Sequence, residues 1–564
     1  MHILMVAAEN DALPKGKVGG LGDVIRDLPI ELGQQHQKVS VITPGYGMLA
    51  NKKNSTLVTD IHLPFKDKTE KVAVYRINDE FSKKNVTYYV LEHWIFSAGG
   101  AGNIYSADHY GPFATDAYKF SLFCAAVCEC LLQKIFETID VLHCHDWHSA
   151  STLILKQYSK RYASLKNIHS VFTIHNLSIQ GIRPFEGDDS SLLSWFPDLE
   201  FDKSLIADPT HSSCMNFMRA GINLADSVNT VSKTYAEEIL LPSNLEKGFV
   251  GGESLEKDLM KAKNEGRLFG IINGINYPSS EQLKDKAPKI STSKLCLLID
   301  KCIQEWALQP NNHSASYYFA LRHLQEWQRK RKESEPIIIS IGRMTQQKLG
   351  LLTESVFNEE FNPHNTCAVE QILSNMDHGI FIMLGNGDSQ YDLFFTKIMK
   401  KYHNFIYLCG YSDKLSQELY QFGDIFMMPS LFEPCGISQM LAMRSGMPCI
   451  GHDIGGLSDT ISHNKNGFLF SGKNLEEKST NLIKTTKLAI DLFLNEKDKW
   501  QQISDNAKLA HFSWESSAKE YIDLLYKTER KIIHKAGTPN KTQSIVKIAS
   551  GNKKEKPKKS TAND

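Results

Sequence analysis

Two basic residues and one acidic residue in the second half of the chain are candidates for ligand binding, the basic pair for a diphosphate and the acidic residue for a polyhydroxyl ligand. Arg343 and Lys348 stand five positions apart, directly after an apolar run. Two fixed cations at such a point can hold a diphosphate and stabilise the charge that it gains on leaving a substrate. Glu433, within Pro429-Ser-Leu-Phe-Glu-Pro-Cys-Gly436, is placed to accept hydrogen bonds from a polyhydroxyl ligand. The alternatives are two solvated surface cations and a carboxylate that caps a helix.

Cys435 is a second candidate for chemistry in this segment. It stands beside a predicted helix N-terminus, which can lower the pKa of a thiol and make it a nucleophile. No histidine lies near Cys435 in the sequence to act as its base. The nucleophile therefore stays an alternative to a glutamate-centred site.

A glycine-rich turn occurs at both ends of the chain. Lys17-Val-Gly-Gly-Leu-Gly-Asp-Val24 follows the apolar run 2–8 and precedes an amphipathic stretch, and Gly455-Gly-Leu-Ser-Asp-Thr460 is a near copy. Backbone N–H groups at a helix N-terminus suit an anion, and Lys17 adds a positive charge. A tight strand-to-helix turn with no ligand explains the same pattern.

Histidines cluster at the ends of two predicted strands, in His143-Cys-His-Asp-Trp-His148 and in Thr173-Ile-His-Asn-Leu177. The carboxyl ends of parallel strands line the binding crevice of an open α/β sheet, which favours a functional role over a place in the core. The first cluster also has metal-ligating side chains. Because adjacent strand residues point to opposite faces and no further ligand is evident, we expect no metal site.

Two series of short apolar runs must position these residues. The first comprises 2–8, 38–43, 86–91, 139–143 and 170–174, and the second comprises 336–341, 380–384, 405–408, 425–428 and 448–450. Buried strands that alternate with helix-length segments are typical of parallel sheets covered on both faces. We therefore predict an α/β protein of two doubly wound, Rossmann-like domains that face each other across a cleft.

The predicted domain plan has five parts. Residues 1–275 form the N-terminal domain, 276–335 a polar linker with surface helices outside the core, and 336–505 the C-terminal domain. Residues 506–530 form a helix whose apolar face docks on a domain, because Ala518, Tyr521, Ile522 and Leu525 share one side. Residues 535–564, rich in Lys and polar residues, form a disordered basic tail.

Composition excludes several classes of protein. The 564 residues are 41% hydrophobic and carry 64 basic and 64 acidic residues, so bulk charge favours neither nucleic acid nor an anionic membrane as a partner. We expect no membrane span and no signal peptide. The 11 cysteines lack the spacing of a disulfide framework, which favours the cytoplasm. The sequence does not indicate an oligomeric state.

Taken in order, these motifs resemble the bacterial glycogen synthase and plant starch synthase family. Its members are retaining glucosyltransferases of the GT-B fold that use ADP-glucose. The similarity spans nearly the whole chain except the tail. It rests on 17–24, 145–148, 172–177 with 180–181, 225–226 with 230–232, 270–275, 342–343 with 347–348, 410–411, 429–439, 455–460 and 512–515.

The resemblance implies a role for each candidate residue. Lys17, Gly19, Gly20 and Asp23 would line the donor site from the first domain, and Gly455 and Gly456 from the second. Arg343 and Lys348 would neutralise the diphosphate, Tyr411 would stack on adenine, and Glu433 would bind the glucosyl unit with the Cys435-Gly436 backbone. His175 would lie near the anomeric carbon, and Asp146 would bind sugar hydroxyls on the acceptor side.

The implied reaction transfers glucose from ADP-glucose to the non-reducing 4-OH of an α-1,4-glucan such as glycogen, with retention of configuration. ADP-glucose is a co-substrate, and no cofactor or metal is implied. The alternatives are a synthase that prefers UDP-glucose, another GT-B glycosyltransferase, and a glucan-binding homologue with weakened catalysis. Departures from the family pattern keep the last one open: the loop before Lys17 is about two residues longer, Asn276 replaces an aspartate, and Leu349 follows Lys348 where glycine is usual.

Overall fold

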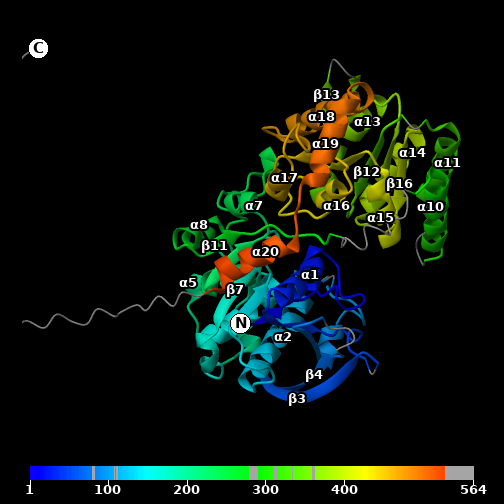
Figure 1. Cartoon of the computed structure of the whole chain (residues 1–564). Coiled ribbons are helices and arrows are strands. Elements are labelled where there is room, and N and C mark those ends of the chain that lie inside the picture. The colour runs from blue at the N-terminus through cyan, green and yellow to red at the C-terminus, as the bar shows by residue number, and fades with distance from the viewer. Residues whose placement is uncertain are drawn as a thin grey trace, which may run out of the picture. The chain divides into compact units, whose positions relative to one another are not determined.

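The computed structural model describes residues 1–527 except 52, 79–82, 107, 109–111, 278–289, 310–314, 333 and 359–361. These residues build one compact unit, Met1–Lys527, that contains two large sheets (Figure 1). The predicted domain boundaries at 275, 335 and 505 stay predictions. The predicted disordered tail, 535–564, lies outside the described residues.

The first sheet has nine strands in the order β11-β10-β7-β6-β1-β2-β5-β4-β3. All its strand pairs are parallel except β3 with β4 and β4 with β5. The strands are β1 His2–Val6, β2 Lys38–Pro44, β3 Ser55–Phe65, β4 Lys68–Ile77, β5 Val86–Glu92, β6 Val141–His145, β7 His169–Ile174, β10 Ser227–Thr230 and β11 Leu268–Gly270.

The second sheet has six strands, all parallel, in the order β16-β15-β12-β17-β18-β19. The strands are β12 Ile337–Ile341, β15 Ile380–Gly385, β16 Phe405–Cys409, β17 Ile425–Met428, β18 Cys449–His452 and β19 Gly467–Phe470. Two small two-stranded antiparallel sheets lie outside both large sheets: β8 Arg183–Pro184 with β9 Cys214–Met215, and β13 Ser355–Asn358 with β14 Asn362–Cys367.

Helices connect most of the parallel strands. In the first half they are α1 Gly20–Gln34, α2 Ala114–Leu132, α3 Ala150–Tyr158, α4 Leu192–Trp195, α5 Lys203–Ile206, α6 Phe217–Leu224, α7 Lys233–Glu238 and α8 Glu256–Asn264. In the second half they are α10 Thr292–Ala307, α11 Ala315–Lys330, α12 Gln346–Thr353, α13 Ala368–Ser374, α14 Ser389–Lys401, α15 Asp413–Phe422, α16 Ser438–Arg444, α17 Gly455–Thr460, α18 Leu475–Asn495, α19 Lys497–Leu509 and α20 Trp514–Glu520.

Both sheets reverse their strand order at one point. Counted along the chain within each sheet, the parallel strands follow the order 3-2-1-4-5-6-7 in the first sheet and 3-2-1-4-5-6 in the second, and 3-2-1-4-5-6 is the order of dinucleotide-binding Rossmann sheets. The reversal lies between β1 and β6 in the first sheet and between β12 and β17 in the second. Ligands of such sheets bind beyond the carboxyl ends of the strands at this point. The loops after β1, β6, β12 and β17 are therefore where a site belongs.

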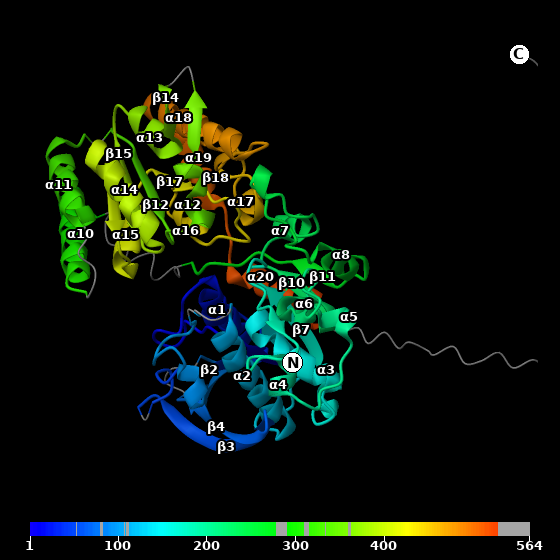
Figure 2. The same ribbon diagram turned by 180° about the vertical axis from the view of Figure 1, so that it is seen from behind.

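Each of the ten predicted strand runs overlaps a strand, and the prediction of two doubly wound parallel sheets is confirmed. The long β3–β4 hairpin, which extends the first sheet at the β5 edge, was not predicted (Figure 2). Its strands bury one residue in two near their ends, as at Ile61, Leu63 and Phe65, and so lack a continuous apolar run.

The expectation that 276–335 lies outside the core is wrong for its two helices. Leu295, Ile299 and Trp306 of α10, with Leu324 and Trp327 of α11, are buried in the core of the second half. Helix α10 packs on α11 and α11 on β16 (Figure 1). The overall polarity of this segment concealed two amphipathic helices.

The C-terminal segment returns to the first sheet. Helix α20 packs against α1, and the π-helical turn Tyr521–Tyr526 continues it (Figure 2). All four predicted face residues, Ala518, Tyr521, Ile522 and Leu525, are buried. Asn229 on β10 donates to the Tyr521 hydroxyl at 3.1 Å, which fixes this turn to the first sheet.

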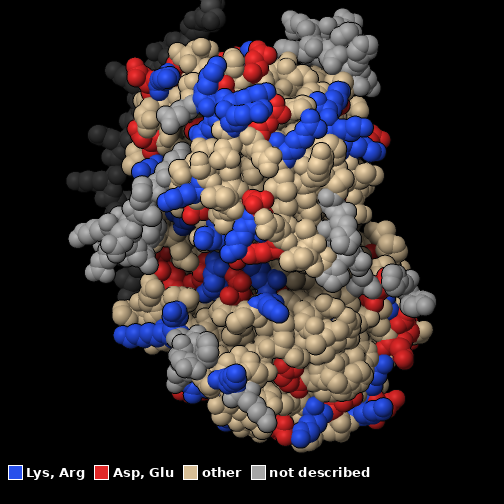
Figure 3. Space-filling view, turned by 90° about the vertical axis from the view of Figure 1, so that its right-hand side faces the viewer, with Lys and Arg blue, Asp and Glu red and all other residues tan. Residues whose placement is uncertain are grey.

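The surface carries both signs of charge. On the face in Figure 3, lysine and arginine side chains are interspersed with aspartate and glutamate side chains. Within the described ranges, no helix has the length and apolar character needed to cross a membrane.

Candidate active site

The first glycine-rich turn is held by a carboxylate from its own loop. Glu9 is 3% exposed, and its Oε2 accepts hydrogen bonds from the backbone N–H groups of Val18 at 2.8 Å and Gly19 at 2.7 Å. The Tyr105 hydroxyl donates to Oε1 of the same carboxylate at 2.7 Å. Two of the N–H groups expected for an anion are thus used internally, and the open side of the turn begins at Gly20.

Lys17 and Asp23 form an ion pair at the entrance to α1. The Lys17 ammonium lies 2.6 Å from Asp23 and 3.9 Å from Asp11, while Arg26 contacts Asp11, Asp23 and Asp27. Burial raises the pKa of Asp23, and the charge of Lys17 opposes that shift. Charge near the turn is therefore mixed, with the Lys17 side chain about one third exposed.

Asp146 and His175 meet at the ends of β6 and β7. The Asp146 Oδ1 accepts a hydrogen bond from the His175 backbone N–H at 2.7 Å. Asp146 has a φ of 53°, in the left-handed region that non-glycine residues avoid, and such strain persists where the surroundings hold it. Burial raises the Asp146 pKa to about 7 and lowers the His175 pKa to about 3. His175 is therefore neutral at physiological pH.

The other histidines of the cluster are engaged by the protein. His143 bonds to the Tyr526 hydroxyl at 2.8 Å and to the Thr173 hydroxyl at 2.7 Å, and His145 Nδ1 lies 3.0 Å from His175 Nε2. The ring of His148 packs at 4.3 Å from that of Trp147. In the part of the chain that the structure describes, no group of three His, Cys, Asp or Glu side chains has metal-ligating geometry.

Lys348 and Glu433 are brought together at the reversal point of the second sheet. The Lys348 ammonium contacts Glu433 Oε2, to which the Ser430 hydroxyl donates at 2.9 Å. The two side chains are 19% and 7% exposed. Arg343 stands at the start of the same loop, exposed to solvent, with no side-chain partner among the described residues. The loop after β12 therefore carries one cation paired with a buried carboxylate and one exposed cation without a described partner.

Cys435 is not activated as a nucleophile. It is 4% exposed, and burial raises the pKa of its thiol to about 12. A thiol with that pKa is protonated at neutral pH and is a poor nucleophile. The burial of Cys435 and the raised pKa of its thiol therefore argue against a cysteine-centred site.

Tyr411 projects from the loop before α15. Its side chain is 52% exposed, and its hydroxyl donates to Asp413 at 2.7 Å. Its backbone oxygen accepts a hydrogen bond from Trp306 Nε1 at 3.2 Å, which fixes the loop. The pKa of Tyr411 is raised to about 12 by burial, by the bond to Asp413 and by the charge of Asp23. Burial contributes most to this shift, and the charge of Asp23, on α1, contributes least.

The second glycine-rich turn joins the two halves of the chain. Gly455 donates its N–H to Glu238 on α7 at 2.9 Å, and Gly456 donates to the Glu433 backbone oxygen at 3.0 Å. Asp459 accepts from the N–H groups of Lys233 at 2.7 Å and Thr234 at 3.1 Å, at the N-terminus of α7. The two similar turns therefore make different contacts, and the second one positions the segment that carries Glu433.

A second contact supports this joint. The Ser232 hydroxyl, just after β10, donates to the Pro434 backbone oxygen at 2.6 Å. Gly455 has a φ of +47°, and a Cβ on it would lie 2.0 Å from the Glu433 backbone oxygen. A Cβ on Gly456 would lie 2.0 Å from the Cys435 backbone oxygen. The 433–435 backbone is therefore packed on two glycines, and no larger residue fits.

Two glycines border open space instead. An added Cβ at Gly20 or Gly342 would meet no atom within 4 Å, and neither residue has a positive φ. Among the described glycines these two alone combine both properties. Gly20 opens α1 after β1, and Gly342 precedes Arg343 after β12. Neither packing nor backbone conformation requires glycine at these two places, so space for a ligand is a sufficient reason.

The structure thus brings the candidate residues together in three groups: Lys17 with Asp23, Asp146 with His175, and Lys348 with Glu433. Gly436, Gly455 and Gly456 adjoin the last group. Within the described residues, no hydrogen bond or ion pair joins one group directly to another. Four residues that position the candidate groups were not predicted from the sequence: Glu9, Tyr105, Ser430 and Glu238. The only signal for Glu9 was an acidic residue at the end of a buried strand, and Tyr105 gave none because it lies 96 positions away.

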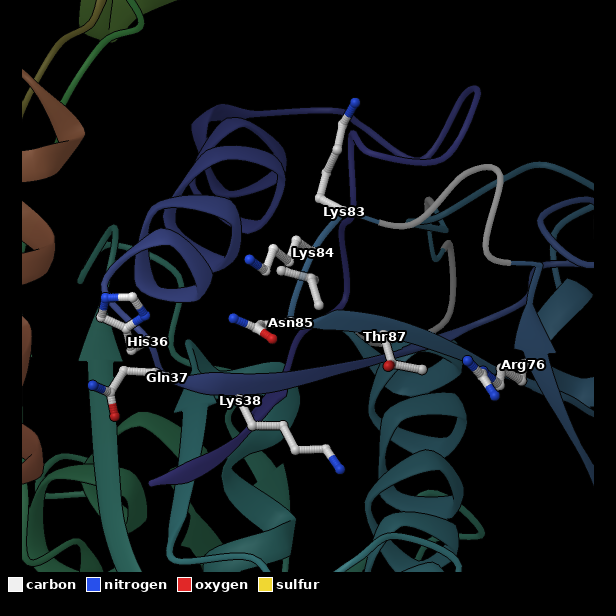
Figure 4. A pocket seen from close by; sticks show the side chains of 9 residues that line it. His36, Gln37, Lys38, Arg76, Lys83, Lys84, Asn85 and Thr87 are labelled. Carbon is white, nitrogen blue, oxygen red and sulfur yellow. The ribbon is translucent and has the colours of Figure 1, made fainter.

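A cavity of about 720 Å³ lies elsewhere, at the amino ends of β2 and β5 (Figure 4). Its lining includes the basic residues Lys38, Arg76, Lys83 and Lys84. Lys38 pairs with Glu137 at 2.5 Å. Parallel sheets bind ligands at the opposite strand ends, so this cavity is separate from the candidate site.

Comparisons with known proteins find similar sequences over nearly the whole chain. Residues 2–261 match the starch synthase catalytic domain, and residues 335–486 match glycosyl transferases group 1. A glycogen synthase from Bacillus cereus is 31% identical over 541 residues, covering 93% of this chain and 99% of that protein. A glycogen synthase from Natranaerobius thermophilus is 30% identical, covering 97% of this chain and 100% of that protein.

Solved structures agree on the fold. The catalytic domain of starch synthase IV from Arabidopsis thaliana has a TM-score of 0.70 at 23% identity and covers 93% of this chain and 98% of that one. Sucrose-phosphate synthase from Thermosynechococcus elongatus has a TM-score of 0.50 at 14% identity and covers 92% and 97%. The predicted GT-B fold is confirmed. The chain belongs to the glycogen synthase and starch synthase family of glucosyltransferases.

Proposed function

We propose that this enzyme transfers glucose from ADP-glucose to the non-reducing 4-OH of an α-1,4-glucan, with retention of configuration. The observation that carries the proposal is the contact of Lys348 with buried Glu433 at the reversal point of the second sheet, with exposed Arg343 on the same loop as Lys348. It combines cations for a diphosphate with a buried carboxylate for a sugar. The match of relatives named glycogen synthase over nearly the whole chain supports the glucan acceptor.

Stabilisation of the leaving diphosphate is the largest catalytic effect in this proposal. Cleavage of the anomeric C–O bond places negative charge on the departing phosphate, and preorganised cations lower the energy of that state. Arg343 is free to bind the diphosphate because no described group occupies it. Lys348, held on Glu433, needs little rearrangement to act beside it. Gly20 and Gly342 leave room for the phosphate to approach the backbone.

To retain the configuration, the acceptor attacks the anomeric carbon on the same face of the sugar from which the diphosphate departs. A retaining enzyme with a carboxylate nucleophile uses two carboxyl groups about 5 Å apart. Among the described candidate residues Glu433 is engaged by Lys348 and Ser430, and no second carboxylate contacts it. The acceptor hydroxyl therefore gives its proton to the departing phosphate oxygen while its own oxygen bonds to the anomeric carbon. No separate base takes part.

Adenine recognition falls to Tyr411. Its exposed ring is held by the bond of its hydroxyl to Asp413 and by the bond of its backbone to Trp306, so one face is available for stacking. The Arabidopsis starch synthase IV structure contains ADP and acarbose, which supports an adenine nucleotide and a sugar as ligands of this fold. Lys17, Asp23, Asp146 and His175 contact the donor and acceptor sugars from the first half.

The test is nucleotide release by purified protein with glycogen and either ADP-glucose or UDP-glucose. We expect release of ADP from ADP-glucose, dependent on glycogen, and slower release of UDP from UDP-glucose. Faster release of UDP would contradict the donor assignment. No release from either donor, in protein shown to be folded, would favour a glucan-binding homologue with weakened catalysis.

A further inference from the structure

Three buried or half-buried imidazoles stand in a row at the ends of β6 and β7. The ring centroids of His143 and His145 are 4.0 Å apart, and those of His145 and His175 are 5.3 Å apart. His143 and His145 are fully buried, and His175 is at the edge of the row, half-buried. The row therefore leads from the core to the candidate site, with His175 as its outer member.

One hydrogen bond joins the middle ring, His145, to the outer ring, His175. His145 Nδ1 and His175 Nε2 are 3.0 Å apart, so one of these nitrogens carries a hydrogen and donates the bond, and the other accepts the bond through its lone pair. Burial lowers the pKa of both rings, that of His175 to about 3, so both are neutral and each carries one proton. Two arrangements are left: His145 donates to His175, or His175 donates to His145.

The second nitrogen of His145 decides between them. Nε2 is buried and has no hydrogen-bond partner in the described part of the chain. If His175 donated, the proton of His145 would sit on this Nε2 as a buried N–H without an acceptor. Buried N–H groups without an acceptor are rare because each one loses its hydrogen bonds to water and gains none in return. If His145 donates from Nδ1, its Nε2 carries only a lone pair, and no buried N–H group of this ring is left without an acceptor.

The neighbouring histidine cannot rescue the other arrangement. Both nitrogens of His143 are occupied, Nδ1 by the Tyr526 hydroxyl at 2.8 Å and Nε2 by the Thr173 hydroxyl at 2.7 Å. The His143 ring instead packs against the His145 ring, with an interplanar angle of 33°. The Asp146 carboxylate fixes the His175 backbone at 2.7 Å. Both rings therefore have a defined orientation.

We infer that His145 is a positioning residue that holds His175 in the tautomer protonated at Nδ1. His175 Nε2 is then the acceptor of the internal bond, and Nδ1–H is left as a donor. No hydrogen bond to Nδ1 is described, and Nδ1 is not among the fully buried atoms without a partner, so it faces accessible space. His175 thus offers a hydrogen-bond donor to a sugar hydroxyl or ring oxygen. This last step, but not the tautomer, rests on the proposed function.

The tautomer is measured directly by NMR on protein with isotope-labelled histidine rings. His145 and His175 are assigned by the loss of their signals in His145→Asn and His175→Asn variants. We expect the protonated nitrogen of His175 to be Nδ1 in the protein without substrate. A proton on His175 Nε2 would overturn the inference whether or not the protein is an active synthase.

Two amide substitutions test the effect on turnover. Asn places its amide near the position of Nδ1 and can still donate to His175, whereas Gln places its amide near the position of Nε2. We expect His145→Asn to keep kcat within about threefold of the wild type and His145→Gln to lower it about 10- to 100-fold, the range seen for outer partners of ligating histidines. Thermal unfolding of both variants shows whether they are folded.

The pattern separates positioning from packing. Equal losses of kcat in the Asn and Gln variants, with equal Tm, would overturn the inference, because then only the ring itself matters. Absence of activity in the wild type with either nucleotide sugar would instead contradict the proposed function, and the NMR result would still decide the tautomer.

Discussion

At the scale of single residues, the cations of the second half differ in what they do for the fold. Lys348 is mostly buried against Glu433, whereas Arg343 is exposed and has no described side-chain partner. If the proposed function holds, we expect loss of Lys348 to lower both stability and turnover, and loss of Arg343 to lower turnover alone. Variants of the two residues therefore distinguish an effect on turnover from an effect on the stability of the fold.

Arg343→Ala should lower kcat about 100- to 1,000-fold, the cost of removing one preorganised group that stabilises developing charge. Its Tm should equal that of the wild type. The matched control is Arg329→Ala, an exposed arginine on α11 with no described partner, which should keep full turnover. Wild-type turnover in Arg343→Ala would contradict the assignment of Arg343 to the diphosphate.

Lys348→Ala should lower the free energy of unfolding by about 3 kcal/mol, because it leaves the Glu433 carboxylate buried without its cation. Urea unfolding measures this change. The double variant Lys348→Ala/Glu433→Gln removes the unpaired charge and should recover most of that stability without recovering activity. If the double variant regained turnover, the pair would be structural and not catalytic.

At the scale of elements, the joint between α7 and α17 positions the segment that carries Glu433. Asp459 accepts hydrogen bonds at the N-terminus of α7, and Glu238 near its C-terminus accepts the N–H of Gly455. Because Gly456 also bonds to the Glu433 backbone, the joint and the site share one segment. Disturbance of the joint should therefore reach the site.

Stability should depend on pH through this joint. Burial raises the Glu238 pKa to about 7 in the folded state, above its ordinary value of 4.5. Between these values the folded state binds more protons than the unfolded state, so the stability that Glu238 contributes falls as pH rises and is lowest above pH 7. Glu238→Gln keeps an acceptor for Gly455 without a charge. Its stability relative to the wild type should rise from pH 5 to pH 8 in urea unfolding, and a constant difference would contradict this.

The C-terminal turn should stabilise the first sheet through Tyr526. Its hydroxyl bonds to buried His143 at 2.8 Å, so Tyr526→Phe leaves Nδ1 of that ring unpaired. We expect a loss of about 1–3 kcal/mol in the free energy of unfolding. Tyr318→Phe, which removes a hydroxyl from a side chain that is 66% exposed, should change little. Equal effects of the two substitutions would contradict a role for the Tyr526 bond.

Prediction from sequence succeeded where a local pattern decides the structure. Buried parallel strands such as Ile337–Ile341 are continuous apolar runs, and loops after them carry the candidate residues. Prediction failed for α10 and α11, where polar surroundings concealed the buried face, and for the β3–β4 hairpin. Partners such as Glu9 with Tyr105, or Glu238 with Gly455, are set by tertiary contacts across 96 and 217 positions and leave no local signal.

At the scale of the whole molecule, each of the two sheets has one reversal point, and the proposed function needs residues from both. The first supplies Lys17, Asp146 and His175, and the second supplies Arg343, Lys348 and Glu433. The turn 17–24 is organised by Glu9, and the turn 455–460 organises the joint. The similar glycine-rich turns thus have different roles in the fold. In the proposed function, residues of both halves act together to extend an α-1,4-glucan.

The most direct test is incorporation of glucose from radiolabelled ADP-glucose into glycogen, followed by digestion of the product with an exo-acting enzyme that cuts α-1,4 bonds from non-reducing ends. The proposal predicts that the label enters glycogen, that the exo-acting enzyme releases it early, and that Arg343→Ala abolishes nearly all of it. Label that stays out of glycogen, or that resists release from the non-reducing ends, would contradict the proposed function.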